Sequence, residues 1–245
     1  MAQTNAVFLN EVLMPAIAAE SVAIPVEGGR QIEADLHVPQ RATGLVVFAH
    51  GSGSSRFSSR NRAVAEFLHE QSLGTLLLDL LTREEEVIDV HTREYRFDID
   101  RLATRMVRAT DWVRNREDLL WLPIGYFGAS TGAAAALIAA AERATIVRAV
   151  VSRGGRPDLA GPPLAKVVAP TLLIVGGDDE PVIDLNDVAK ARMQSAHVEM
   201  RIVPGATHLF EEPGTLEQVE RLAVDWFRRY LDTSRAGHHG PPGSA

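Results

Sequence analysis

The sequence predicts an α/β domain in which helices cover both faces of a mostly parallel sheet of about eight strands. Strand-like and helix-like segments alternate along the chain from about residue 20. Several of the strand-like segments, such as Leu45–Ala49, are continuous apolar runs, which is typical of parallel strands buried on both faces. In addition, 46% of the 245 residues are hydrophobic, which is enough to fill the core of one large domain.

The sheet is expected to begin with an antiparallel pair and to continue with parallel strands. Glu27-Gly28-Gly29-Arg30 separates the first two apolar segments and is typical of a hairpin turn. Most of the later strands are separated by helix-like segments, which favours parallel pairing. We expect strands over residues 21–26, 31–38, 45–49, 75–78, 123–127, 147–151, 171–175 and 198–203.

Helices are predicted where apolar residues recur every three or four positions, as at Ile99, Leu102 and Met106. We expect helices from residue 58 or 59 through 68, and over 98–115, 131–142, 185–193 and 216–230. Asp184 is the expected N-cap of the fourth of these. Arg83-Glu84-Glu85-Glu86 is expected to be a solvated charge run.

The domain organisation predicted from these patterns has three parts. Residues 1–19 form an N-terminal extension, 20–232 the α/β domain, and 233–245 a tail that is expected to be disordered because its Gly, Pro, His and Ser residues show no periodicity. The first basic residue of the chain is Arg30, so the extension lacks the positive charge of a secretory signal. We therefore expect no secretory signal and a cytoplasmic location.

Composition excludes several classes of protein. With 25 basic and 32 acidic residues the net charge is −7, which argues against a nucleic-acid binder. The absence of cysteine excludes disulfides, thiolate zinc sites and a cysteine nucleophile. The most apolar stretch covers only residues 133–141, whereas a helix needs about 20 residues to cross a bilayer, so we expect no membrane span.

A nucleophile motif follows the predicted strand 123–127. Gly128-Ala129-Ser130-Thr131-Gly132 has the pattern G-x-S-x-G between a predicted strand and a predicted helix, where a serine is exposed on a tight turn. The two glycines would prevent collisions with neighbouring elements, and the helix N-terminus would place N–H groups beside Ser130. The alternative is a serine that only caps an Ala-rich helix.

His208 is the histidine that best fits the role of a general base for Ser130. It follows the last predicted strand in Gly205-Ala206-Thr207-His208, at the edge of the sheet where the parallel strands end. A serine hydroxyl needs such a base to become a good nucleophile. We therefore predict that Ser130 and His208 act together.

A carboxylate is expected to orient His208 and to stabilise its protonated form. We predict Asp179, which lies one residue beyond a tight glycine turn after the strand 171–175. The chain order serine, acid, histidine is then satisfied. Asp178 and Asp158 are the alternatives.

Two backbone N–H groups are predicted to form an oxyanion hole, which stabilises the tetrahedral intermediate of acyl transfer. The first is that of Thr131, directly after the nucleophile, and the second is that of Ser52, in the glycine-rich turn Gly51-Ser52-Gly53. We expect His50 to order this turn by hydrogen bonding. The chain has no nucleotide-binding glycine motif, and we expect no cofactor and no metal ion.

Two arginines follow the predicted strand 147–151 and could reach the same edge of the sheet. Arg153 and Arg156 could bind an anionic acyl or leaving group of the substrate. The alternative is that each pairs with a nearby carboxylate.

Together these motifs resemble the α/β-hydrolase fold and, within it, the dienelactone hydrolase family in a compact form without a large lid. The resemblance covers residues 20–232 and depends on the segments 49–55, 128–132, 176–182 and 205–208. Dienelactone hydrolases themselves use a cysteine nucleophile and a glutamate after the first buried strand. This chain has Ser130 and His50-Gly51 at those places. The resemblance therefore implies a serine-nucleophile variant.

The sequence thus predicts a serine hydrolase that cleaves short carboxylic esters or lactones through an acyl-enzyme on Ser130. Its expected partner is a small-molecule ester. Acyl transfer from the same acyl-enzyme to an alcohol or amine is one alternative. The other is a non-catalytic binding module on a hydrolase scaffold.

Overall fold

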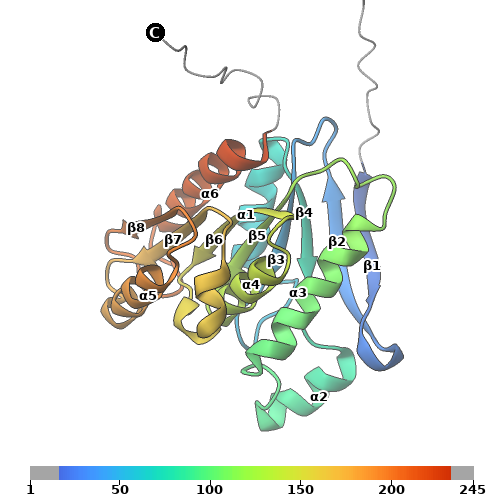
Figure 1. The fold of residues 1–245 in the computed structure, drawn as a ribbon, viewed down its shortest axis with the longest axis horizontal. Coiled ribbons are helices and arrows are strands. Elements are labelled where there is room, and N and C mark those ends of the chain that lie inside the picture. The colour runs from blue at the N-terminus through green and yellow to red at the C-terminus, as the bar shows by residue number, and fades with distance from the viewer. Residues whose placement is uncertain (1–16, 233–245) are drawn as a thin grey trace, which may run out of the picture.

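The computed structural model describes residues 17–232 and contains an eight-stranded, mostly parallel sheet (Figure 1). The strands are β1 (Ile17–Pro25), β2 (Gln31–Val38), β3 (Leu45–Ala49), β4 (Gly74–Leu78), β5 (Ile124–Ala129), β6 (Val147–Arg153), β7 (Thr171–Gly176) and β8 (Val198–Val203). Their order in the sheet is β1-β2-β4-β3-β5-β6-β7-β8. β2 pairs antiparallel with β1 and β4, and the other pairs are parallel, which confirms the predicted fold class.

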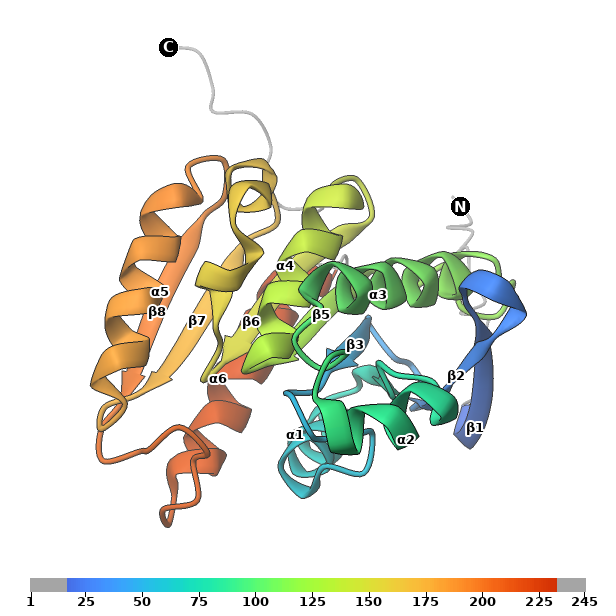
Figure 2. The same ribbon diagram turned by 90° about the horizontal axis from the view of Figure 1, so that it is seen from below.

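Helices cover both faces of the sheet (Figure 2). They are α1 (Ser59–Glu70), α2 (Arg83–Thr92), α3 (Ile99–Arg114), α4 (Thr131–Glu142), α5 (Glu180–Arg192) and α6 (Thr215–Leu231). α1 and α6 lie on one face and α3, α4 and α5 on the other, while α2 lies outside these layers near the start of α3. None of the described helices is long and apolar enough to cross a lipid bilayer.

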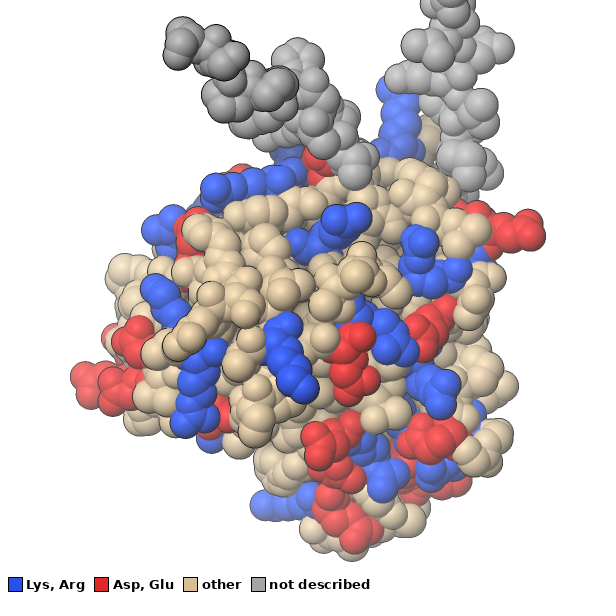
Figure 3. Space-filling view, in the orientation of Figure 1, with Lys and Arg blue, Asp and Glu red and all other residues tan. Residues whose placement is uncertain are grey.

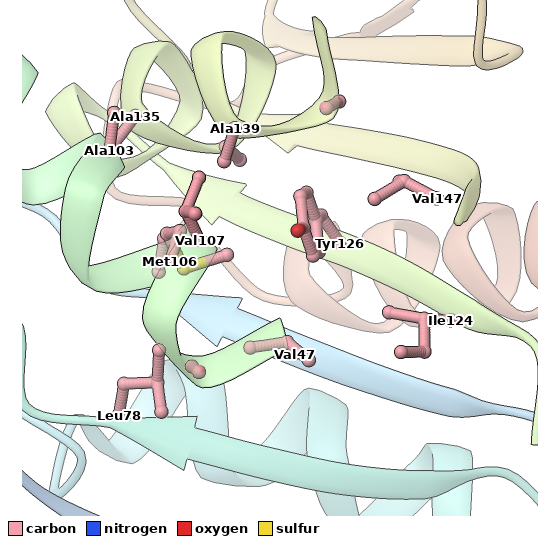
Figure 4. Close-up of a cluster of buried hydrophobic side chains, with 14 of the residues drawn as sticks. Val47, Leu78, Ala103, Met106, Val107, Ile124, Tyr126, Ala135, Ala139 and Val147 are labelled. Carbon is pink, nitrogen blue, oxygen red and sulfur yellow. The ribbon is translucent and has the colours of Figure 1, made fainter. Parts of the chain in front are cut away.

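Each face of the sheet has its own hydrophobic core. On the face covered by α3 and α4, the ring of Tyr126 lies among aliphatic side chains such as Val107 and Ile124 (Figure 4). The Tyr126 hydroxyl is fully buried and shares a hydrogen bond with Thr110, so its polar group is satisfied inside the core. The alanines of α4, including Ala135 and Ala139, allow that helix to lie close to the sheet.

The structure differs from the sequence-based expectations in three places, which are the start of β1, the start of α5 and the acidic run at 83–86. β1 begins at Ile17, so the predicted domain boundary at residue 20 lies inside a strand. α5 begins at Glu180, because the proline at residue 181 is compatible with the first turn of a helix, and its N-cap is Asp179 instead of Asp184. The predicted disordered tail, residues 233–245, lies outside the described residues.

The third difference concerns the acidic run at 83–86, which is helical and partly buried. Thr82 and Glu85 form a capping box, in which the Thr82 side chain accepts from the Glu85 amide and the Glu85 carboxylate accepts from the Thr82 amide. Glu85 is buried in this arrangement, so the expectation of a solvated charge run was wrong for this residue, whereas Arg83, Glu84 and Glu86 are exposed.

Strand register brings the candidate chemistry to one edge of the sheet. Ala49 of β3 pairs with Gly128 of β5, and Ala129 pairs with Arg153 of β6. The loops that follow these parallel strands therefore meet at their carboxyl ends, where ligands bind in sheets of this kind.

Candidate active site

Ser130 lies on a strained turn between β5 and α4. Its backbone adopts φ 50° and ψ −121°, a left-handed conformation that is uncommon for a residue with a side chain. It occupies the N-cap position of α4, but its side chain makes no capping hydrogen bond. The Ser130 side chain therefore does not cap the helix.

Two glycines make this turn sterically possible. A Cβ atom at Gly128 would lie 2.4 Å from the Ala133 Cα atom, and one at Gly132 would lie 2.4 Å from the carbonyl oxygens of Ala49 and His50. Any side chain at either position would force the turn away from its neighbours, as the motif predicted.

The end of β6 and the residues that follow it hold the backbone of Ser130 on both sides. The Ser130 amide donates to the carbonyl of Arg153 at 3.3 Å, and the Arg156 amide donates to the carbonyl of Ser130 at 3.0 Å. The strained conformation is thus maintained by the neighbouring strand.

The structure brings Ser130, His208 and Asp179 together. Nε2 of His208 lies 3.2 Å from the hydroxyl oxygen of Ser130, and Nδ1 of His208 lies 2.7 Å from Oδ2 of Asp179. The carboxylate bonded to the imidazole is thus that of Asp179. Asp178 is exposed, and both carboxylate oxygens of Asp158 are bonded to Arg156. The Asp179 side chain is only 14% exposed, which strengthens its hydrogen bond to His208.

Contacts within its own loop position His208. The Thr207 amide and hydroxyl both donate to the carboxylate of Glu212, at 3.1 and 2.6 Å. The Thr207 hydroxyl contributes most to a lowered pKa of Glu212, so this carboxylate stays charged at neutral pH. Phe210 is buried and anchors the loop to the core. No sequence pattern indicated the role of Glu212.

The glycine-rich turn after β3 lies against the nucleophile. A Cβ atom at Gly51 would be 3.1 Å from that of Ser130, so only glycine fits this close approach comfortably. Nδ1 of His50 lies 2.8 Å from the Gly51 carbonyl, and its Nε2 accepts from the Leu80 amide at 3.0 Å. Burial lowers the pKa of His50, so the ring is neutral and orders the turn, as expected, instead of acting as a base.

The two predicted oxyanion-hole residues both lie beside Ser130. Thr131 is the first residue of α4, where helix N–H groups lack a partner within the helix. Ser52 lines a cavity of about 190 Å³ together with Ser130 and His208.

The two arginines predicted to bind substrate differ from each other. Arg156 forms two hydrogen bonds with Asp158, each of 2.8 Å, and does not line this cavity. Arg153 does line it and is buried. Arg60 and Asn61 of α1 also line the cavity. The sequence did not indicate these two, because nothing in a helix pattern shows which of its polar side chains faces a loop after another strand.

Comparison with known proteins identifies the family. A crystal structure of dienelactone hydrolase from Anabaena variabilis is 56% identical in sequence, with a TM-score of 0.85, over 87% of this chain and 98% of that one. The chain belongs to the dienelactone hydrolase family. No family model matches the sequence.

More distant structures share the fold. Est1E from Butyrivibrio proteoclasticus is 17% identical with a TM-score of 0.70, over 85% of this chain and 98% of that one. An esterase from Pyrococcus furiosus is 16% identical with a TM-score of 0.72, over 87% of this chain and 92% of that one. At these low identities the likeness shows a shared fold.

Two curated relatives are longer than this chain. Both are Mycobacterium tuberculosis proteins named "Putative phosphoribosyl transferase", from two strains, and each is 56% identical over 217 residues. The match covers 89% of this chain but only 48% of theirs, so the chain spans about half the length of these relatives.

Proposed function

We propose that the protein hydrolyses short carboxylic esters through an acyl-enzyme on Ser130. The single observation that carries this proposal is the imidazole of His208, which lies within hydrogen-bonding distance of both the Ser130 hydroxyl and the Asp179 carboxylate. The Ser130 side chain takes part in no helix cap, so its hydroxyl is available to this imidazole.

The geometry supports the following sequence of steps. Nε2 of His208 takes the proton of the Ser130 hydroxyl while the serine oxygen attacks the ester carbonyl carbon. The Asp179 carboxylate accepts from Nδ1–H, which fixes the tautomer and stabilises the imidazolium. The amides of Thr131 and Ser52 stabilise the negative oxygen of the tetrahedral intermediate.

His208 then gives the proton to the departing alkoxide, and the C–O bond of the ester breaks. In the second half of the reaction, water loses a proton to His208 and attacks the acyl-serine, which releases the acid and restores the Ser130 hydroxyl. The cavity beside Ser130 holds about 190 Å³, below the range of about 300–1,000 Å³ typical of ligand pockets, which favours short substrates.

Covalent labelling tests the proposal directly. We expect a fluorophosphonate to add one label to the native protein at Ser130, as measured by intact and peptide mass spectrometry, and to leave the Ser130→Ala variant unlabelled. A folded native protein that stays unlabelled would contradict the proposal and favour a non-catalytic binding module.

Ester hydrolysis by matched aspartate variants tests the role of the acid. We expect Asp179→Asn to lower kcat for a short aryl ester by about 10⁴-fold, because the imidazole loses its orienting carboxylate. Asp178→Asn, one residue away on an exposed side chain, serves as the control and should retain most of the activity. Equal losses of kcat in the two variants would show that Asp179 is not the acid of the site.

A further inference from the structure

Arg153 is a buried cation that has no counter-ion among residues 17–232. Its side chain projects from the end of β6, and the residue is only 7% exposed. Nε and Nη1 are inaccessible to solvent and have no hydrogen-bond partner among the described residues. Arg153 lines the same cavity as Ser130 and His208.

The surroundings of Arg153 add positive charge. Arg60 also lines the cavity, and no carboxylate does so within residues 17–232. Arg60 has its own partner, Glu211, at 2.8 Å, and Glu211 is exposed outside the cavity. Burial, together with the nearby charge of Arg60, lowers the pKa of Arg153 to about 10, so the guanidinium is still charged at neutral pH.

This arrangement is unusual for a folded protein. A buried charge is normally paired, because its lost hydration is otherwise not replaced. The nearby Arg156 follows that rule through its two bonds to Asp158. An unpaired buried guanidinium in a site next to a nucleophile therefore points to a ligand that supplies the missing negative charge.

We propose that Arg153 binds a second, free carboxylate of the ester substrate, so that the preferred substrates are short half-esters of dicarboxylic acids. This inference rests on the proposed ester hydrolysis at Ser130. A guanidinium suits this role because its N–H groups match the two oxygens of a carboxylate. The small cavity requires that the two carbonyl groups of such a substrate be only a few bonds apart.

A matched pair of esters tests the proposal. Monoethyl fumarate and ethyl crotonate share the ethyl ester and the trans double bond, and they differ in a carboxylate against a methyl group. The measured quantity is the ratio of kcat/KM for monoethyl fumarate to kcat/KM for ethyl crotonate, from chromatography of the released acids. We expect Arg153→Met to lower this ratio by about 10- to 100-fold, the value of one or two charge-assisted hydrogen bonds.

Arg156→Met is the matched control, because it removes the same side chain three positions away where the charge is already paired. It should leave the ratio within about twofold of the native value, because Arg156 does not line the cavity and so makes no charge-assisted hydrogen bond to the substrate carboxylate. Arg153→Lys, which keeps the charge but loses the fork of N–H groups, should give an intermediate ratio.

The outcomes separate the two proposals. If the native protein is labelled at Ser130 and hydrolyses ethyl crotonate, but Arg153→Met leaves the ratio unchanged, the role of Arg153 is overturned while ester hydrolysis stands. The same holds if Arg153→Met lowers both rates equally, which would indicate that Arg153 acts on the reacting oxygen or on the turn. If no ester is hydrolysed and Ser130 is not labelled, the proposed function itself fails.

Inhibition gives a second measurement that does not require turnover of the charged ester. Fumarate should compete with ethyl crotonate in the native protein, and Arg153→Met should raise its inhibition constant by about 10-fold or more. An inhibition constant that does not change would contradict a carboxylate site at Arg153.

Discussion

Two buried arginines, in two regions of the molecule, have opposite electrostatic surroundings. Arg105 of α3 is completely buried, and its terminal nitrogens bond to Glu85 at 2.8 Å and to Glu27 at 3.0 and 3.1 Å. Glu85 also accepts from Arg30 and Arg101, so charges of both signs alternate in this region. Acidic and basic side chains are correspondingly interspersed over the lower part of the surface in Figure 3, where α2 and the start of α3 lie.

Arg153, in contrast, is almost as buried but contacts no carboxylate in the part of the chain that the structure describes. Arg105 leaves only its Nε without a partner, whereas Arg153 leaves Nε and Nη1. The comparison indicates that the fold compensates a buried charge where that charge is structural. At the edge of the candidate active site the described residues leave the buried charge of Arg153 uncompensated, and a ligand would have to supply the negative charge.

The largest expected effect on stability is in the paired region. Arg105→Met removes one partner of a buried network, so Glu85 loses its contact at 2.8 Å and Glu27 its contacts at 3.0 and 3.1 Å. We expect the free energy of unfolding to fall by about 3–5 kcal/mol, as measured by urea denaturation at pH 7. A loss below about 1 kcal/mol would mean that the network is no more stabilising than an exposed ion pair.

A smaller effect is expected at Asp89, also in the paired region. Burial raises the pKa of Asp89, but hydrogen bonds from the Arg96 amide and guanidinium and from the Tyr95 amide outweigh it, so the pKa lies below its ordinary value of 3.8. The stabilisation is therefore fully present above pH 3.8 and is lost as the pH falls through the lower pKa of the folded state.

Asp89→Asn tests this sign. We expect the variant to be about 2–3 kcal/mol less stable than the native protein at pH 7, because charge-assisted hydrogen bonds are lost. The difference should shrink as the pH is lowered below 3.8, where the carboxylate is protonated in the unfolded state, and should be smallest below the lower pKa of the folded state. Urea denaturation at several pH values measures it, and a difference that stays constant with pH would contradict the assigned pKa.

The smallest effect on stability is expected at Arg153. Arg153→Met removes a charge that has no partner among the described residues, so the lost hydration of that charge no longer opposes folding. We expect the free energy of unfolding to stay within about 1 kcal/mol of the native value or to rise. A loss as large as that of Arg105→Met would show that Arg153 is a structural arginine and would remove the contrast between the two regions.

Much of the fold could be predicted because its determinants are local. The buried runs at β3 and β7, the hairpin of β1 and β2, and the apolar periodicity of α3 and α6 are each visible within about a dozen residues. α2 was missed, although Thr82-Arg83-Glu84-Glu85 carries a capping-box pattern, because its apolar residues are exposed and give no buried stripe.

The meeting of Ser130, Asp179 and His208 could be predicted because each follows a parallel strand, and the ends of parallel strands share an edge. Whether Arg153 and Arg156 each pair with a carboxylate could not be predicted. Arg153 and Arg156 are three residues apart in one segment, yet one is paired and the other is not. That difference depends on which carboxylate the loop brings within reach, and sequence spacing alone does not give it.

The backbone bonds between Ser130 and the segment 153–156 have a consequence for evolution of this site. The same four residues shape the bend that carries the hydroxyl and display the guanidinium. Amino-acid changes there would alter rate and substrate preference together. New preferences should arise more readily through α1, which reaches the cavity with Arg60 and Asn61 and takes no part in those backbone bonds.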